Sequence, residues 1–142
     1  MQLTTSYWTS RCLHVVADLG IADLISDQPQ STEALAKASG TQPNALYRVL
    51  RLLASLGIFE WEQGAWRHTD ASRFLRSDHP GSLRDYVRML GLPEFWNAFS
   101  DLQHSLCTGE PAFAKHHPEG IFEYLATHIE QSRIFNAAMV MK

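Results

Sequence analysis

The side chains best suited to chemistry in this chain are histidines and a cysteine in its second half. His104 and Cys107 are three residues apart, so they share a face if this stretch is helical, and His116 and His117 follow a loop later. A zinc site needs about four ligands at matched distances, and this spacing is loose. The sequence therefore predicts no metal site, with the histidines in solvent, in a loop or near a helix end, and Cys107 as a small buried apolar residue.

Motifs for catalysis and for cofactor binding do not occur in the sequence. Its glycines form neither the GxGxxG nor the GxxxxGK loop that holds a nucleotide, and GxSxG and HExxH are also missing. A Ser-His-Asp triad can be assembled on paper from any chain with 7 histidines, so the sequence gives it no support. We predict no catalytic residue and no cofactor bound by this chain itself.

Aromatic and methionine side chains are dense in the same half of the chain. Two interpretations remain open: these side chains pack a core, or a subset lines an apolar pocket that grips a planar molecule. The sequence alone does not separate them. The set comprises Met89, Phe95, Trp96, Phe99, Phe113, Phe122, Tyr124, Phe135, Met139 and Met141.

The elements before this half have the pattern of a helix-turn-helix. A capped helix from Thr32 is expected to end at Gly40. A second helix restarts with Pro43 in its first turn and stops at Gly57. Its apolar residues recur with the 3.6-residue period of an amphipathic helix, at Leu46, Val49 or Leu50, Leu53 and Leu56.

A β-wing is expected directly after the second helix. The short β-prone runs 58–61 and 65–69 are joined around Gln63-Gly64, which indicates a hairpin. A helix or a pair of helices, broken at Gly20, precedes this region, and further helices follow it at 83–90, 94–106, 120–126 and 130–141. The predicted fold is mainly α, a winged helix-turn-helix with a small β-wing plus additional C-terminal helices.

We divide the chain into residues 1–76, the N-terminal helices and winged-helix unit, and 77–142, a helical segment. The last helix reaches Lys142 without a Gly, Asn or Pro terminator, so it is expected to have been cut from a longer chain.

Composition and charge favour a globular protein that does not bind nucleic acid. The hydrophobic content is 45%, the charged content 19% and the formal net charge −3. Compact DNA-binding domains are usually basic because they neutralise phosphates, so this balance counts against DNA. The two cysteines have no metal or redox spacing, which favours a reducing cytoplasm. No apolar run reaches the ~20 residues that cross a bilayer, so no membrane association is predicted.

A series of motifs in this order resembles the N-terminal dimerisation domain of the plant-type, S-adenosylmethionine-dependent small-molecule O-methyltransferases, including their bacterial members. Each motif is weak by itself, but the order and spacing fit from residue 10 to the C-terminus. The motifs are ADLGIAD from Ala17, TEALA from Thr32, NALYRVLRLLASLGIF from Asn44, HT at His68, SLR at Ser82, TGEPAF from Thr108, FEYL from Phe122 and FNAAM from Phe135.

The resemblance implies a dimerisation and substrate-wall domain of an O-methyltransferase acting on a small, aromatic or polyketide-like hydroxyl acceptor. It implies a homodimer through the N-terminal helices and the winged helix, with no DNA role. It also implies that a following Rossmann-like domain, absent from this chain, supplies the S-adenosylmethionine loop and the catalytic base. The positions matching the acceptor-pocket wall are Met89, Phe95, Leu125, Phe135 and Met139, with Ile121 and Gln131 as weaker matches.

Two other functions stay open at this point. The chain could be a winged-helix transcription regulator that reads DNA with Tyr47, Arg48, Arg51 and Ser55. This hypothesis fails if Arg48 and Arg51 pair with carboxylates of the same fold. The chain could also be a stand-alone dimerisation or accessory protein without a catalytic domain.

Overall fold

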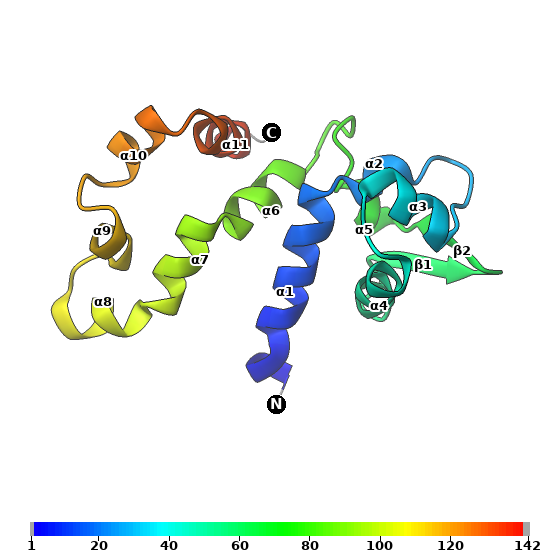
Figure 1. The fold of residues 1–142 in the computed structure, drawn as a ribbon, viewed down its shortest axis with the longest axis horizontal. Helices are drawn as coiled ribbons and strands as arrows, with labels where there is room; N and C mark the ends of the chain where they lie inside the picture. Colours follow the sequence, from blue (N-terminus) through cyan, green and yellow to red (C-terminus); the bar gives the residue numbers. More distant parts are fainter. Residues whose placement is uncertain (1, 141–142) are drawn as a thin grey trace. The chain divides into compact units, whose positions relative to one another are not determined.

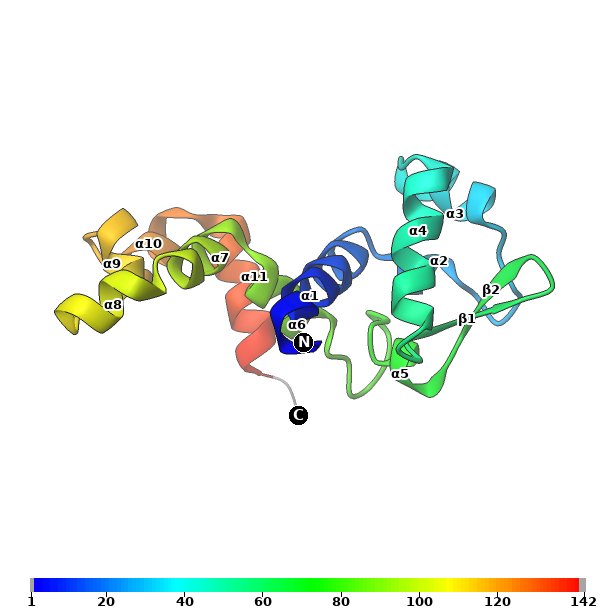
Figure 2. The same cartoon turned by 90° about the horizontal axis from the view of Figure 1, so that it is seen from below.

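The computed structural model describes residues 2–140, and the chain divides into two compact units, one up to Arg84 and one from Asp85 (Figure 1, Figure 2). The described part is mainly helical with one small antiparallel sheet, which confirms the predicted fold class. Met141 and Lys142, expected at the end of the last helix, lie outside the described residues. Each helix within residues 2–140 is too short or too polar to span a bilayer.

The first unit opens with four helices, and several of their ends lie at signals seen in the sequence. The helix expected to stop at Gly57 ends earlier, at Ala54. Gly20 has a φ of 66° and separates the first two helices, as predicted. The Ser31 hydroxyl caps the third helix by accepting from Ala34 N, and Gly40 ends that helix at a φ of 67°. The helices are α1 (Gln2–Asp18), α2 (Ile21–Leu24), α3 (Thr32–Ser39) and α4 (Pro43–Ala54).

The wing is an antiparallel hairpin of β1 (Phe59–Glu62) and β2 (Ala65–His68). Gln63 and Gly64 both have positive φ, 51° and 83°, as a two-residue hairpin turn of the primed type requires. Gln30 forms an isolated antiparallel β-bridge with Trp66 of β2, with backbone hydrogen bonds of 3.0 and 2.8 Å. The sequence did not reveal this bridge.

The core of the first unit lies between the helices and the inner face of this hairpin. Trp66 is fully buried, and its indole N–H donates to the Thr32 hydroxyl over 3.0 Å. Burial of these apolar side chains drives the packing of α4 against β1 and α3. The other large side chains in this core are Val16, Ile21, Ile25, Leu35, Leu46, Leu50, Leu53, Phe59 and Leu75.

His68 joins three segments at the end of the wing. Its Nε2 lies 2.7 Å from the Ile25 carbonyl oxygen and its Nδ1 lies 2.9 Å from the Ser72 hydroxyl. A carbonyl oxygen only accepts, so Nε2 carries the proton and Nδ1 accepts from Ser72. Thr69 and Ser72 form a capping box that starts the short helix α5 (Asp70–Arg73).

We expect the first unit to lose stability as the pH falls below the ordinary histidine pKa of 6.5. Burial lowers the pKa of His68 from that value, and Arg73 and Arg76 act in the same direction. The folded state therefore binds fewer protons than the unfolded state. Stability is fully present above pH 6.5 and is lost as the pH drops through the lowered pKa. Burial also lowers the pKa of His14, with the same sign.

Thermal unfolding at about pH 7.5 and about pH 5.5 measures this loss. His68→Gln should lower the Tm at both values, by an amount typical of about 1–3 kcal/mol for hydrogen-bonding groups left unpaired. The difference in Tm between the two pH values should become smaller than in the wild type, because, of the two histidines His14 and His68, only His14 then remains to titrate. If the difference in Tm is as large as in the wild type, groups other than His68 cause the pH dependence.

The second unit contains only helices in its described residues, with two differences from the sequence expectation. The predicted single helix 94–106 is two helices, because the backbone of Asp101 leaves the helical region at ψ 20°. A further short helix stands in the expected loop around His116. The helices are α6 (Arg84–Gly91), which begins at the boundary, α7 (Pro93–Ser100), α8 (Leu102–Thr108), α9 (Ala112–His116), α10 (Ile121–Thr127) and α11 (Ile129–Met139).

A small apolar cluster holds α6 and α11 together in the second unit. Met89, Ile134 and Ala138 are buried, and Phe95 and Phe135 pack against them with rings nearly parallel at 12° and centroids 6.4 Å apart. This cluster is much smaller than the core of the first unit.

Candidate functional site

An apolar face of α1 is the first candidate site. Val16 and Ala17 at the C-terminal end of the helix are buried, whereas the turns before it have little cover from the described chain. Contiguous exposed apolar area of this kind marks an interaction surface. The face consists of Leu3, 91% exposed, together with Tyr7, Trp8 and Val15, and it continues to Leu19 directly after the helix.

A groove beside this face combines apolar and basic groups. Arg48, Arg51 and Leu52 of α4 line it together with Cys12 of α1, around about 470 Å³. Among residues 2–140 no carboxylate pairs with either arginine, so the condition that would exclude DNA reading is not met. Tyr47, however, packs against Trp61 and Trp66 of the wing and is not available to read bases.

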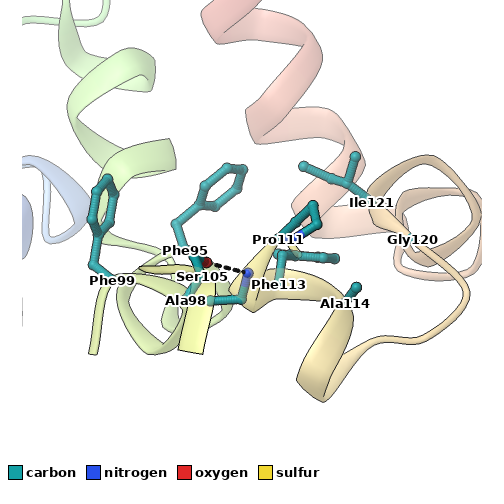
Figure 3. A pocket seen from close by; sticks show the side chains of 10 residues that line it. Phe95, Ala98, Phe99, Ser105, Pro111, Phe113, Ala114, Gly120 and Ile121 are labelled. Atoms are coloured by element: carbon teal, nitrogen blue, oxygen red, sulfur yellow. Dashed lines mark hydrogen bonds between the residues drawn. The ribbon is translucent and has the colours of Figure 1, made fainter. Parts of the chain in front are cut away.

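A cavity of about 450 Å³ in the second unit is the second candidate site (Figure 3). Side chains from α7, α8, the start of α9 and α10 surround it, and of the described residues that line it none is titratable. This arrangement can bind an apolar molecule but cannot move a proton. The principal lining side chains are Phe95, Ala98, Phe99, Ser105, Phe113 and Ile121.

The break between α7 and α8 shapes this cavity. The Asp101 carboxylate binds Lys115 and His116 of α9, and these two hydrogen bonds lower the pKa of Asp101. The Ser105 hydroxyl accepts from Ala112 N over 2.9 Å. Both contacts hold α9 against the α7–α8 turn, so the helix break that the sequence did not reveal closes one side of the cavity.

A polar link joins α10 to α7. The Tyr124 hydroxyl donates to Glu94 Oε1 over 2.6 Å, while Glu94 Oε2 is buried and finds no hydrogen-bond partner in the described residues. Burial and then this hydrogen bond raise the pKa of Tyr124 to about 12. The Tyr124 ring stacks on His128 at 3.8 Å. Tyr124 therefore stays a neutral donor that fastens α10 to α7.

The predicted wall residues do not gather in one place. Met89, Phe95 and Phe135 meet in the apolar cluster, Leu125 is buried in α10, and Met139 is 54% exposed. Of these five, Phe95 alone also lines the cavity. Their role in acceptor binding stays a prediction. Phe99 and Phe113 belong to the aromatic set found in the sequence but were not predicted as site residues. Ile121 was a weaker match to the acceptor-pocket wall.

Sequence reasoning did not weigh Ser105 as a site residue. Its signal would have been the helix break at Asp101, which turns Ser105 toward the start of α9. Within residues 2–140 no three His, Cys, Asp or Glu side chains gather to hold a metal ion. His116 binds Asp101. Cys107 is exposed, so the prediction that it is buried was wrong.

A winged-helix unit whose first helix leaves an apolar face uncovered is a module for association. Residues 1–78 match the O-methyltransferase dimerisation domain. The chain belongs to this family of dimerisation domains.

The chain is similar to part of several methyltransferases. It is 43% identical to the phenazine O-methyltransferase PhzM of Lysobacter antibioticus, covering 97% of this chain and 40% of that protein. The crystal structure of LaPhzM superimposes with a TM-score of 0.92 at 43% identity, over 97% of this chain and 42% of the other. The methyltransferase CalO1 of calicheamicin biosynthesis, in an SAH-bound form, gives a TM-score of 0.85 at 30% identity, over 97% and 41% of the two chains. The chain thus spans about two fifths of these relatives.

A methyl donor of the S-adenosylmethionine type does not fit the cavity. That molecule carries a sulfonium cation, a carboxylate and an adenine, whereas the lining offers one hydroxyl and no charge. This cavity is therefore unsuited to the donor, and no step of methyl transfer is assigned to its lining residues.

Proposed function

We propose that this chain is the dimerisation and substrate-wall domain of an S-adenosylmethionine-dependent methyltransferase with a small aromatic hydroxyl acceptor. In this proposal residues 1–76 form the homodimer and residues 77–142 form part of the acceptor wall. The methyl donor and the catalytic base are held by another part of the longer protein. The family match and the names of the relatives support this assignment.

The uncovered apolar face of α1 is the observation that carries the homodimer. Trp8 is 56% exposed and lies edge-on to Tyr7, with ring centroids 5.8 Å apart. Leu52 of the neighbouring α4, and Leu56 just after that helix, add further exposed apolar area. A second copy that covers this surface would bury an area in the range of obligate interfaces, above about 2,000 Å².

Light scattering of the 142-residue chain tests the homodimer. We expect a mass of twice the 16.1 kDa of one chain at micromolar concentration. A monomer at this concentration would contradict the proposal, since the apolar face of α1 would then have no partner in solution.

The acceptor wall is assigned to Met89, Phe95, Leu125, Phe135 and Met139. Met139, with about half of its side chain exposed, and Phe135, half-buried one turn before it, present an aromatic ring and a pliable thioether on α11. Such a pair suits contact with a flat ring. The buried positions of Met89 and Leu125 suit support of that surface.

Phe135→Ala in a longer methyltransferase that contains this domain should lower kcat/KM for the acceptor. Losing one apolar wall contact corresponds to about 1–3 kcal/mol, or roughly 5- to 150-fold. Steady-state kinetics with varied acceptor measures the change. Phe122→Ala is the matched control, because Phe122 is 73% exposed on the neighbouring helix. Unchanged acceptor kinetics together with a lower Tm would make Phe135 a core residue instead.

A further inference from the structure

We propose that a polar recess in the first unit, between the wing and the loop that precedes α3, is a binding site for the zwitterion of a small α-amino acid. The recess has a volume of about 200 Å³. It lies wholly within the first unit, so this site rests on neither the homodimer nor the acceptor wall. The polar side chains that line it are Ser26, Asp27, Glu60, Arg67, His68 and Arg73.

Hydrogen bonds within the chain fix the walls of this recess. The loop before α3 is held to the end of β2, because His68 Nε2 donates to the Ile25 carbonyl oxygen over 2.7 Å. Within the loop, the Ser26 hydroxyl donates to the Gln28 carbonyl oxygen and accepts from the Gln28 N–H. Burial lowers the pKa of His68, so its ring is a neutral part of the wall at about pH 7. Fixed walls reduce the ordering that a ligand must impose when it binds.

Opposite charges line the recess without pairing with each other. Glu60 and Arg67 are directly opposite on the two strands of the wing, where opposite charges usually interact. Arg67 binds Glu62 instead, with Nε and Oε2 3.0 Å apart. The side chain of Glu60 forms no ion pair or hydrogen bond with the rest of residues 2–140, and the same holds for Asp27 and Arg73. Two carboxylates and one guanidinium therefore line the recess without a partner of opposite charge.

These three charges define a ligand that carries both signs. A simple anion would meet the carboxylates of Asp27 and Glu60, and a simple cation would meet the guanidinium of Arg73. A zwitterion satisfies both sets, because its carboxylate can accept from the guanidinium fork of Arg73 while its ammonium donates to the two carboxylates.

The size of the recess limits the size of the ligand. Sites for drug-sized molecules have volumes of about 300–1,000 Å³, whereas this recess has about 200 Å³. An amino acid with a small side chain matches the smaller volume. An extended peptide is disfavoured, because its inner residues carry neither a free ammonium nor a free carboxylate at the backbone.

Glycine, glycolate and ethanolamine form a matched set of probes, because glycolate lacks the ammonium and ethanolamine lacks the carboxylate. Each probe is titrated into the 142-residue chain at about pH 7 and low salt, and backbone amide shifts are followed by NMR. We expect glycine to shift amides of the loop before α3, of β2 and of α5, with a Kd of about 1–10 mM. Glycolate and ethanolamine should each bind about 10-fold more weakly, because each loses one set of charge-assisted hydrogen bonds.

The probes also define the results that overturn the proposal. If recess amides do not shift at saturating glycine, water fills the recess and there is no ligand site. Glycolate that binds as tightly as glycine would make the recess a plain anion site. Ethanolamine that binds as tightly as glycine would make it a plain cation site.

Variants assign the two charges of the ligand to their partners. Arg73→Gln should weaken glycine by about 10-fold and leave ethanolamine within about 2-fold. The double variant Asp27→Asn with Glu60→Gln should weaken glycine and ethanolamine but not glycolate. All three side chains are exposed, so we expect these variants to fold. Lys37→Gln and Glu33→Gln are the matched controls, because they remove exposed charges of the same signs from α3 outside the recess.

The controls separate a specific site from an effect of net charge. Glycine should bind both control variants as it binds the wild type. If Lys37→Gln weakens glycine as much as Arg73→Gln does, the recess residues do not form the site. The proposal also fails if Arg73→Gln weakens ethanolamine and glycine equally, since the guanidinium then does not hold a carboxylate.

Discussion

Replacing Trp66 by alanine is expected to lower the free energy of unfolding of the first unit by about 3–5 kcal/mol, the usual cost of removing a buried aromatic side chain. Trp66 is fully buried, and it contacts the ring of Tyr47 from α4 and the ring of Trp61 from β1. The change would also leave the buried Thr32 hydroxyl without its indole partner. The loss is a large part of the stability of an ordinary domain.

Urea unfolding followed by circular dichroism measures this cost. Trp61→Ala is the matched control on the opposite strand, because Trp61 is 40% exposed and should cost about 1 kcal/mol. Equal losses for the two variants would mean that Trp66 does not anchor the core. Trp66→Phe keeps most of the ring volume, so it separates the packing contribution from the hydrogen bond to Thr32.

Trp8→Ala is expected to weaken the proposed homodimer strongly while leaving the single chain folded. A central aromatic residue of an interface typically contributes about 2–4 kcal/mol, which corresponds to a Kd increase of roughly 30- to 1,000-fold. More than half of the Trp8 side chain is exposed in the single chain, so its removal creates no cavity there. The helical content should therefore stay unchanged.

Analytical ultracentrifugation over a concentration series measures the dissociation constant. Phe122→Ala removes an exposed aromatic ring from the second unit and should leave the constant at the wild-type value. If Trp8→Ala and Phe122→Ala dissociate alike, the interface does not include the α1 face. A dimer that persists unchanged in Trp8→Ala would assign dimerisation to another surface.

Local signals in the sequence were sufficient for most elements of the first unit. The cap of the helix that begins at Thr32, the helix end at Gly40, the break at Gly20 and the turn at Gln63-Gly64 were all predicted and are confirmed. These signals work because capping hydrogen bonds and left-handed backbone conformations involve residues within a few positions of one another. The family could be predicted for a similar reason, since its motifs follow one another in linear order.

Contacts between distant segments could not be predicted in this way. The pairing of Gln30 with Trp66 and the bond from His68 to Ile25 join residues 36 and 43 positions apart, and neither has a sequence pattern. The helix break at Asp101 also depends on contacts, because Lys115 and His116 hold its carboxylate from a later helix. A continuous apolar stripe across this break made a single helix the natural expectation.

The sequence by itself therefore determined the fold class, the order of most helices and strands, and the kinship with methyltransferase dimerisation domains. Only the tertiary structure decided which of the aromatic residues pack a core and which line a cavity. Phe95 contacts both, whereas Phe113 lines the cavity and Phe135 joins the apolar cluster. All three are equally apolar in sequence, and their roles differ because side-chain burial is set by which helices meet, not by residue type.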